Sequence, residues 1–537
     1  MYENKKLWIG MSGTDKVVIE PSMANRHGLI AGATGTGKTT TLRVMAESFS
    51  DAGVPVFLAD VKGDLAAMCR PGREEGFVAA RIEEYGLKDQ GFSVHGCPTA
   101  YWDVYAEKGM PLRTTVSEMG PLLLSRVLGL NNTQEEVLTV IFKIADDNDM
   151  LLIDTKDLRA MLTYVGDNAK ELSLKYGNMS KQSLASIIRA VIALETEGGE
   201  KFFAEPALNI ADWIRCNADG KGYINILECE KLIMNPTMYG TFLLWMLSEL
   251  YETLPEVGDM EKPRLVFFFD EAHLLFSNAS KELAEKIEQV VKLIRSKGVG
   301  IYFITQSPSD VPNGVLAQLS NKVQHALHAY TPAEQKSIKA AADSFRANPE
   351  FNTAEILQNL GIGEAIVSVL DESGVPTVAQ KTIILPPQCS MDTLSNEDRD
   401  NLIKQSDLYL KYNESIDRDS AYEFLERKAV ADAEALEKAK AEMEAQKQAE
   451  KDAIAAQKQA EKEAAAAQKA AEKAELAKKK QATKVVKNVA SSAGTTIGRE
   501  VGQTIGNAVG GSFGKKLGGN LGASIGRGIL GSIISGK

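Results

Sequence analysis

The sequence predicts an α/β protein built around a mostly parallel β-sheet. A glycine-rich loop joins a short apolar run to an amphipathic segment within residues 29–50, and buried-strand runs recur along the chain with helical patterns between most of them. This alternation is typical of a parallel sheet covered by helices on both faces. The predicted core strands are 29–33, 54–60, 223–228, 265–270, 300–306, 322–329, 365–370 and 381–385.

The loop at residues 32–39 matches the phosphate-binding pattern G-x-x-x-x-G-K-[ST] in full. Its small residues allow backbone N–H groups to close around a β-phosphate at a helix N-terminus. Lys38 would reach the β- and γ-phosphate oxygens, and the Thr39 hydroxyl would bind Mg²⁺. The alternative, a chance glycine-rich turn, is disfavoured because a strand and a helix flank the loop. The predicted nucleotide-binding residues are Gly32, Thr34, Gly35, Thr36, Gly37, Lys38, Thr39 and Thr40.

The apolar run at 265–269 ends in two carboxylates, Asp270 and Glu271. We expect Asp270 to hold Mg²⁺, directly or through water, and Glu271 to polarise the water that attacks the γ-phosphate. The alternative is that an apolar run ends in Asp-Glu by chance. A complete phosphate loop earlier in the same chain argues against that alternative. The glutamate also argues against a kinase, in which a substrate hydroxyl attacks and no water is activated.

Three further features have weaker support. Gln306 ends a predicted strand, and the carboxyl ends of neighbouring strands meet at the nucleotide. Its side chain could therefore sense the γ-phosphate or orient the water. Alternatively, it is simply a polar residue at the end of a strand. Arg295 could stabilise transition-state charge in its own subunit or across an interface, or be a surface arginine. The acidic residues and lysine of 60–64 could form a switch behind the site, contact a partner, or make a plain turn.

The segments around these motifs suggest a modular chain. Residues 1–28 read as a short β-like lead-in, and 29–390 as the ATPase core. Within the core, 111–214 carries apolar residues at helical spacing and is predicted to be an all-α insertion between the second and third core strands. Its expected role is a lid or a partner-docking element. Residues 395–428 are predicted to be helical and amphipathic.

The composition changes sharply after this point. Residues 429–480 are mostly Ala, Glu, Lys and Gln, with an 11-residue near-repeat at 445–451, 456–462 and 467–473. These are strong helix formers with almost no large apolar side chains, so a solvated helical spacer is expected. Residues 490–537 form a glycine zipper, with glycine at every fourth position from Gly494 to Gly526. Such a stripe permits close helix packing against itself, a partner or a membrane, or it is a flexible low-complexity tail.

The overall composition restricts the class of protein. A formal net charge of −11 argues against a generally basic surface, but it permits a local basic pore. The five scattered cysteines form no C-x-x-C pair, which suits a reducing compartment. The first residues show no signal-peptide core, and there is no apolar stretch of spanning length. We therefore expect a cytoplasmic protein, with peripheral membrane association through the tail left open.

Taken together, the motifs resemble the HerA/FtsK superfamily of P-loop ATPases, and most closely its bacterial HerA-like branch (the YjgR type). The matching stretches, which span about residues 25–390, are 27–39, 60–64, 269–273, 295–300 and 305–308. The resemblance implies a RecA-like core, a ring that is often hexameric, and ATP hydrolysis by Glu271. It also implies Gln306 as a sensor and Arg295 as a finger that reaches a neighbour's nucleotide.

Two departures from the superfamily affect the expected function. Little chain precedes the phosphate loop, so the N-terminal β-barrel of archaeal HerA is not expected, and a glycine-zipper tail is foreign to a simple DNA pump. With ATP and Mg²⁺ as cofactors, the leading hypothesis is a hexameric ATPase that moves or remodels double-stranded DNA. The second is an ATPase acting on protein at a membrane surface through the tail. The third is a nucleotide-gated scaffold with slow hydrolysis.

Overall fold

The computed structural model describes residues 1–258, 260–277, 281–329 and 331–479. Within these residues, thirteen strands form one mixed sheet in the order β1-β2-β13-β12-β11-β4-β10-β9-β5-β8-β6-β7, with β3 beside β2. The strands are β1 (Tyr2–Glu3), β2 (Lys6–Ser12), β3 (Asp15–Ile19), β4 (Gly28–Ala31), β5 (Val56–Asp60), β6 (Thr99–Asp103), β7 (Met110–Pro111), β8 (Ile224–Glu228), β9 (Leu265–Phe269), β10 (Val299–Thr305), β11 (Asn321–His325), β12 (Glu364–Ser368) and β13 (Gln380–Ile384).

The sheet is mostly parallel, as predicted. Every neighbouring pair from β11 across to β7 runs parallel, whereas the pairs among β11, β12, β13, β2, β1 and β3 are antiparallel. Each of the eight predicted core strands is present, and the largest difference in length is at β11, which ends at His325 rather than at 329. In the parallel part, the carboxyl ends of β4, β10, β9 and β5 lie along one edge of the sheet, which fixes where a site can form.

The sequence did not predict β6 and β7. These strands lie beyond β8 at one end of the sheet, between the second predicted core strand and the helical insertion, whose first helix begins at Val116. β6 is short and reads Thr-Ala-Tyr-Trp-Asp, with a polar residue at each end and no run of aliphatic side chains. Its stability comes from tertiary packing: Trp102 is fully buried, and its indole Nε1 donates to Asn225 Oδ1 of β8 at 3.1 Å.

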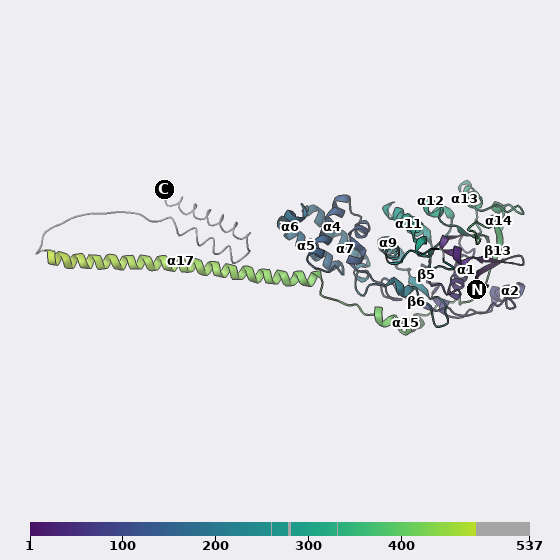
Figure 1. Ribbon diagram of the computed structural model, residues 1–537, viewed down its shortest axis with the longest axis horizontal. Coiled ribbons are helices and arrows are strands. Elements are labelled where there is room, and N and C mark those ends of the chain that lie inside the picture. Colours follow the sequence, from purple (N-terminus) through teal and green to yellow (C-terminus); the bar gives the residue numbers. More distant parts are fainter. Residues whose placement is uncertain (259, 278–280, 330, 480–537) are drawn as a thin grey trace. The chain divides into compact units, whose positions relative to one another are not determined.

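Helices cover both faces of the sheet (Figure 1). Their bounds are α1 (Lys38–Asp51), α2 (Gly76–Glu84), α3 (Val116–Val127), α4 (Asn132–Asp147), α5 (Thr155–Asp167), α6 (Ala169–Tyr176), α7 (Lys181–Leu194), α8 (Glu200–Phe202), α9 (Pro236–Thr253), α10 (Ala272–Ser277), α11 (Lys281–Ile294), α12 (Asn313–Leu316), α13 (Pro332–Asp343), α14 (Thr353–Asn359), α15 (Asn396–Gln405), α16 (Tyr409–Tyr412) and α17 (Ala421–Lys479).

The aromatic residues of β9 show how the two faces are filled. Because successive side chains of a strand point to opposite faces, Phe268 points to one face of the sheet, and residues 267 and 269 point to the other. Phe268 packs against Phe49 of α1, with ring centroids 6.1 Å apart. Phe267 packs at 5.1 Å against Phe57 of β5, and Phe57 in turn meets Phe242 of α9 at 6.3 Å. The all-apolar sequence of β9 is therefore explained by a strand that is buried on both faces.

Helices α3–α8 occupy the region predicted to be helical, and α4–α7 gather in one cluster (Figure 1). Local signals in the sequence fix where these helices begin. Asn131 and Gln134 form a capping box at the start of α4, and Asp154 and Asp157 form one at the start of α5. Helix α3 bends at Gly120, whose φ of 70° lies in the left-handed region that glycine tolerates.

The chain separates into two compact units, Met1–Glu434 and Ala435–Lys537. α17 is a single helix of 59 residues, so the predicted Ala/Glu/Lys/Gln spacer is helical over its described part. The first turn of α17 is bound to the insertion: the Ser420 hydroxyl donates to Asp157 Oδ1 at 2.6 Å, and the backbone N–H of Ala421 donates to Leu151 O at 2.9 Å. The predicted glycine zipper at 490–537 lies outside the described residues.

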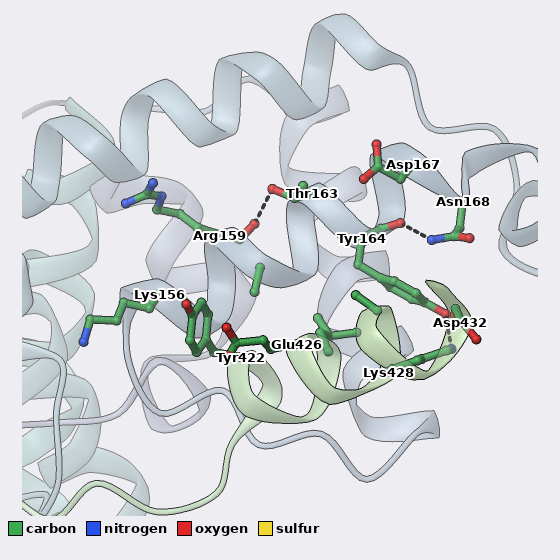
Figure 2. Close-up of a pocket in the computed structure, with 13 residues that line it drawn as sticks. Lys156, Arg159, Thr163, Tyr164, Asp167, Asn168, Tyr422, Glu426, Lys428 and Asp432 are labelled. Carbon is green, nitrogen blue, oxygen red and sulfur yellow. Dashed lines mark hydrogen bonds between the residues drawn. The ribbon is translucent and has the colours of Figure 1, made fainter. Parts of the chain in front are cut away.

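A hollow of about 750 Å³ lies between α5 and the first turns of α17 (Figure 2). Its walls carry charges of both signs, including Lys156 and Arg159 on one side and Asp432 on α17. Lys428 of α17 crosses to the insertion, where its ammonium donates to the Tyr164 hydroxyl at 2.8 Å. The insertion thus anchors the first turns of α17, up to Asp432. Among the described helices, none combines the length and apolarity that crossing a membrane requires.

Candidate functional site

The predicted phosphate loop joins β4 to α1 at the carboxyl edge of the parallel strands. The backbone N–H of Gly32 donates to Thr305 O of β10 at 3.2 Å, and that of Ala33 donates to Ala326 O at 2.9 Å, so both neighbouring strands anchor the loop. Gly35 and Gly37 have φ values of 79° and 112°, a conformation that glycine adopts without steric cost. The loop is therefore preformed, and its tip at Thr34 and Gly35 is exposed.

Lys38 begins α1 and turns back over the loop. Its ammonium donates to Gly32 O at 2.7 Å and to Ala33 O at 3.0 Å. Burial lowers the pKa of Lys38; the carboxylate of Glu271 opposes this shift, and the positive charge of Lys62 adds to it. Thr39 and Thr40 follow on the first turn of α1 and are partly exposed. All eight predicted nucleotide-binding residues thus lie on one continuous loop and helix start.

A histidine and a glycine that the sequence did not single out pack beneath this loop. His325 accepts a hydrogen bond from the Thr41 hydroxyl through Nε2 at 2.8 Å, while its Nδ1–H donates to Glu364 O at 2.8 Å. A Cβ at Gly32 would lie 2.5 Å from the Cβ of His325, so only glycine fits there. Gly363 donates its backbone N–H to Thr36 O at 2.9 Å. These contacts from His325 and Gly363 support the phosphate loop on the side that faces β11 and β12.

The two predicted carboxylates lie directly after β9, at the same edge of the sheet. Asp270 is buried, and burial raises its pKa to about 6 although the nearby Lys62 opposes the shift. Asp270 Oδ1 accepts the backbone N–H of Glu271 at 2.9 Å. Glu271 itself has a φ of 48°, in the left-handed region that non-glycine residues rarely occupy. Such a backbone persists only where surrounding contacts impose it, and it aims the Glu271 side chain towards the edge.

Lys62 is the direct partner of Glu271. It follows β5, and its Nζ lies 2.5 Å from Glu271 Oε1 and 3.9 Å from Asp270 Oδ2. Burial would raise the pKa of Glu271, but the ammonium of Lys62, together with the charges of His273 and Lys38, holds that pKa below its ordinary value. The other oxygen, Glu271 Oε2, is buried without a hydrogen-bond donor and lies 3.3 Å from His273 Nδ1. Oε2 is therefore the carboxylate oxygen that Lys62 does not hold.

Gln306 immediately follows β10, whose Thr305 carbonyl is bonded to the phosphate loop. Its side chain is exposed at this edge. Asp310 fixes the turn that follows: its Oδ2 accepts from the Thr305 hydroxyl at 2.6 Å and from the backbone N–H of Ser307 at 2.9 Å. Gln306 is thus brought to the same edge as the phosphate loop, Asp270 and Glu271.

Arg295 is not brought to this edge. It begins a short 3₁₀ turn at the end of α11, ahead of Val299, the first residue of β10. Since β10 and β4 are parallel, this end of β10 lies beside His27 at the amino end of β4, and the positive charge of Arg295 acts on that buried histidine. Seven residues of β10 separate the two edges, roughly 20 Å of strand. Arg295 therefore lies at the opposite edge of the sheet from the phosphate loop of its own chain.

The family's sequence profile described as "Helicase HerA-like C-terminal" matches residues 6–536. The chain belongs to this HerA-like helicase family. The predicted likeness to the HerA/FtsK superfamily of P-loop ATPases is thereby confirmed, as are the α/β fold and the mostly parallel sheet.

Sequence relatives include two archaeal proteins. A probable helicase of Methanocaldococcus jannaschii is 25% identical over 365 residues, covering 64% of each chain. The DNA double-strand break repair helicase HerA of Sulfolobus acidocaldarius is 21% identical over 366 residues, covering 67% of this chain and 65% of that protein. The chain thus spans less than two thirds of the length of these relatives.

Among solved structures, similar chains include the plasmid coupling protein TrwB in complex with ADP and Mg²⁺. That chain is 14% identical with a TM-score of 0.46, over 74% of this chain and 91% of its own. VirB4 of Thermoanaerobacter pseudethanolicus is 15% identical with a TM-score of 0.44, over 72% of this chain and 97% of its own.

Proposed function

We propose that this HerA-like chain is a Mg²⁺-dependent ATP hydrolase. The observation that carries the proposal is the convergence of the phosphate loop and the Asp270–Glu271 pair on neighbouring parallel strands, in the order β4, β10, β9. The loop N–H groups and Lys38 would bind the β- and γ-phosphates. Glu271, whose Oε2 is not held by Lys62, would orient and deprotonate the attacking water. Gln306, at the same edge, would sense the γ-phosphate.

The donor set at this edge suits Mg²⁺. Magnesium prefers oxygen ligands and is commonly held by one or two protein groups together with nucleotide phosphates and waters. The Thr39 hydroxyl, at the start of α1, and the buried Asp270 carboxylate supply such ligands. A pKa of about 6 leaves Asp270 largely ionised at neutral pH, ready to bind a cation. When bound, Mg²⁺ would neutralise charge on the phosphate oxygens and orient them.

The direct test of this proposal is Lys38→Ala in the full chain. The variant would lose the ammonium that faces the β- and γ-phosphates, so ATP turnover should fall to background while the thermal unfolding midpoint changes little. Lys143→Ala, an exposed lysine of α4, is the matched control and should leave turnover unchanged. Normal turnover in Lys38→Ala would refute the assignment of the loop.

We further propose that the substrate moved or remodelled by this ATPase is double-stranded DNA. The family's description as helicase-like and the DNA repair helicase among the relatives support DNA over other substrates. Anisotropy of a labelled duplex with a non-hydrolysable ATP analogue would test binding, with affinity falling as salt rises because phosphate contacts release counterions. Vesicle flotation of the same protein tests the alternative, an ATPase that acts at a membrane surface through residues 490–537.

We propose a closed ring, of which a hexamer is the expected form, in which Arg295 completes the site of the next subunit. The support is the position of Arg295 at the edge opposite its own phosphate loop, so that any role on a nucleotide requires a neighbour. Mixing Lys38→Ala with Arg295→Ala chains tests this: each variant alone should be inactive, and mixed rings should recover part of the turnover. Full activity of Arg295→Ala alone, or no recovery of turnover in the mixed rings, would exclude the role.

A further inference from the structure

Lys62 is a second lysine beside the predicted phosphate site. It lies in a turn after β5 that Asp60 fixes: Oδ1 of Asp60 accepts the backbone N–H of Gly63 at 2.8 Å, and Oδ2 accepts that of Leu65 at 3.0 Å. The turn presents the Lys62 side chain towards β9, the neighbouring strand. Its side chain is about half exposed, with a relative accessibility of 47%, while its ammonium is paired with Glu271. The lysine is therefore fixed at its backbone and held at its ammonium by one carboxylate.

The two lysines at this edge have different partners. The ammonium of Lys38 is satisfied by the carbonyls of its own loop, whereas that of Lys62 is held by Glu271 at 2.5 Å. An ammonium on Glu271 Oε1 occupies a lone pair and makes the carboxylate a poorer proton acceptor. In this arrangement the glutamate expected to activate water is restrained by a neighbouring cation. Lys62 is also close enough to Lys38 for its charge to act on that residue.

We propose that Lys62 exchanges its partner, leaving Glu271 for the γ-phosphate when a nucleoside triphosphate binds, so that Glu271 becomes free to activate water only in the triphosphate state. This inference rests on the proposed ATPase function. A γ-phosphate is a stronger attractor of an ammonium than one carboxylate, because it carries more charge and three acceptor oxygens. A diphosphate lacks that group, so Lys62 stays on Glu271. Lys62 is thus a positioning residue that discriminates between triphosphate and diphosphate.

The experiment compares the affinities of the full chain for ADP and for the β,γ-imido analogue of ATP, both with Mg²⁺. In Lys62→Met, the preference for the triphosphate analogue should fall about tenfold or more, while ADP affinity changes less than about threefold. Lys62→Arg keeps the charge and should keep most of the preference. Lys143→Met, on α4, is the matched control and should behave like the parent protein.

A second measurement does not depend on Lys62→Met being stable. Glu271→Gln removes the charge that holds Lys62, so its preference for the triphosphate analogue should rise by about threefold or more over the parent. The double variant with Lys62→Met should show no such rise. An unchanged preference in Lys62→Met, or no rise in Glu271→Gln, would overturn the exchange, even if turnover falls. If the parent protein binds neither nucleotide, the proposed ATPase function itself is wrong, which is a separate outcome.

Discussion

Glu271→Gln is the substitution whose effect the geometry defines most closely. In the parent chain, Oε1 of Glu271 faces Lys62 at 2.5 Å, and Oε2 is buried without a donor. In the variant, the amide oxygen would face Lys62 through a weaker, uncharged hydrogen bond, and the NH₂ group would take the position of Oε2. An amide nitrogen donates hydrogen bonds and cannot accept a proton from water. The substitution therefore removes the base and preserves the shape of the site.

The expected loss follows from what general-base catalysis supplies. Removing a positioned base costs about 10²- to 10⁴-fold in rate, which corresponds to about 3–5 kcal/mol in the activation barrier. Steady-state hydrolysis of radiolabelled ATP at saturating concentration measures kcat, and displacement of a fluorescent nucleotide measures binding. We expect kcat to fall by that factor while ATP still binds. Glu135→Gln, on α4 of the insertion, is the matched control. A kcat within about fivefold of the parent would refute the role of Glu271.

Three further predictions concern stability. Arg399 Nη1 of α15 donates to Glu228 Oε2 at 2.7 Å, and both side chains are buried. In urea denaturation, Arg399→Met should lower the free energy of unfolding by about 3 kcal/mol, because it leaves the buried Glu228 without its arginine partner, and adding Glu228→Met should restore most of that loss. An equal loss in the single and the double variant would contradict this expectation. His27 is buried and its pKa is lowered from 6.5 to about 4, so between these two pH values only the unfolded chain binds the proton. The free energy of unfolding should therefore drop by roughly 3 kcal/mol as the pH falls through that window. Thermal melts from pH 7.5 to 5 measure this pH dependence of stability, which His27→Gln should flatten. At Gly28 of β4 an added Cβ would lie 2.3 Å from a tyrosine ring of β10, so Gly28→Ala should lower the free energy of unfolding by about 2 kcal/mol. In Gly166→Ala of α5 the nearest atom would be 3.6 Å from the new Cβ, so this control should be neutral or stabilising. An unchanged stability in Gly28→Ala would show that the neighbouring strand moves to accommodate the methyl group.

The parts of the site that the sequence predicts are those with a local pattern. The phosphate loop needs its glycines, lysine and threonine in one stretch, and Asp270 and Glu271 come directly after a strand that is apolar at every position. Both features are therefore visible without knowledge of distant contacts. The parallel topology then places them at one edge, since neighbouring parallel strands end together.

The residues that the sequence did not identify depend on contacts between distant segments. His325 supports Gly32 from 293 positions away in the chain, and Gly363, which donates its backbone N–H to Thr36, is needed because an added Cβ would lie 2.5 Å from Arg81 Nη2. The sequence singled out Lys62 within 60–64 as part of a possible switch, but not its pairing with Glu271, 209 positions away. A strand order is needed before such pairs can be proposed. The place of Arg295 could have been foreseen, because it precedes β10 and so belongs to the amino edge.

The central claim is that this site hydrolyses ATP to act on double-stranded DNA. The measurement that tests it most directly is steady-state ATP turnover of the full chain with and without linear duplex DNA, with Glu271→Gln as the blank. We predict that DNA raises turnover about tenfold or more, a lowering of the activation barrier by about 1.4 kcal/mol. Turnover that equals the blank would contradict the ATPase assignment, and turnover that is clear but unchanged by DNA would contradict DNA as its substrate.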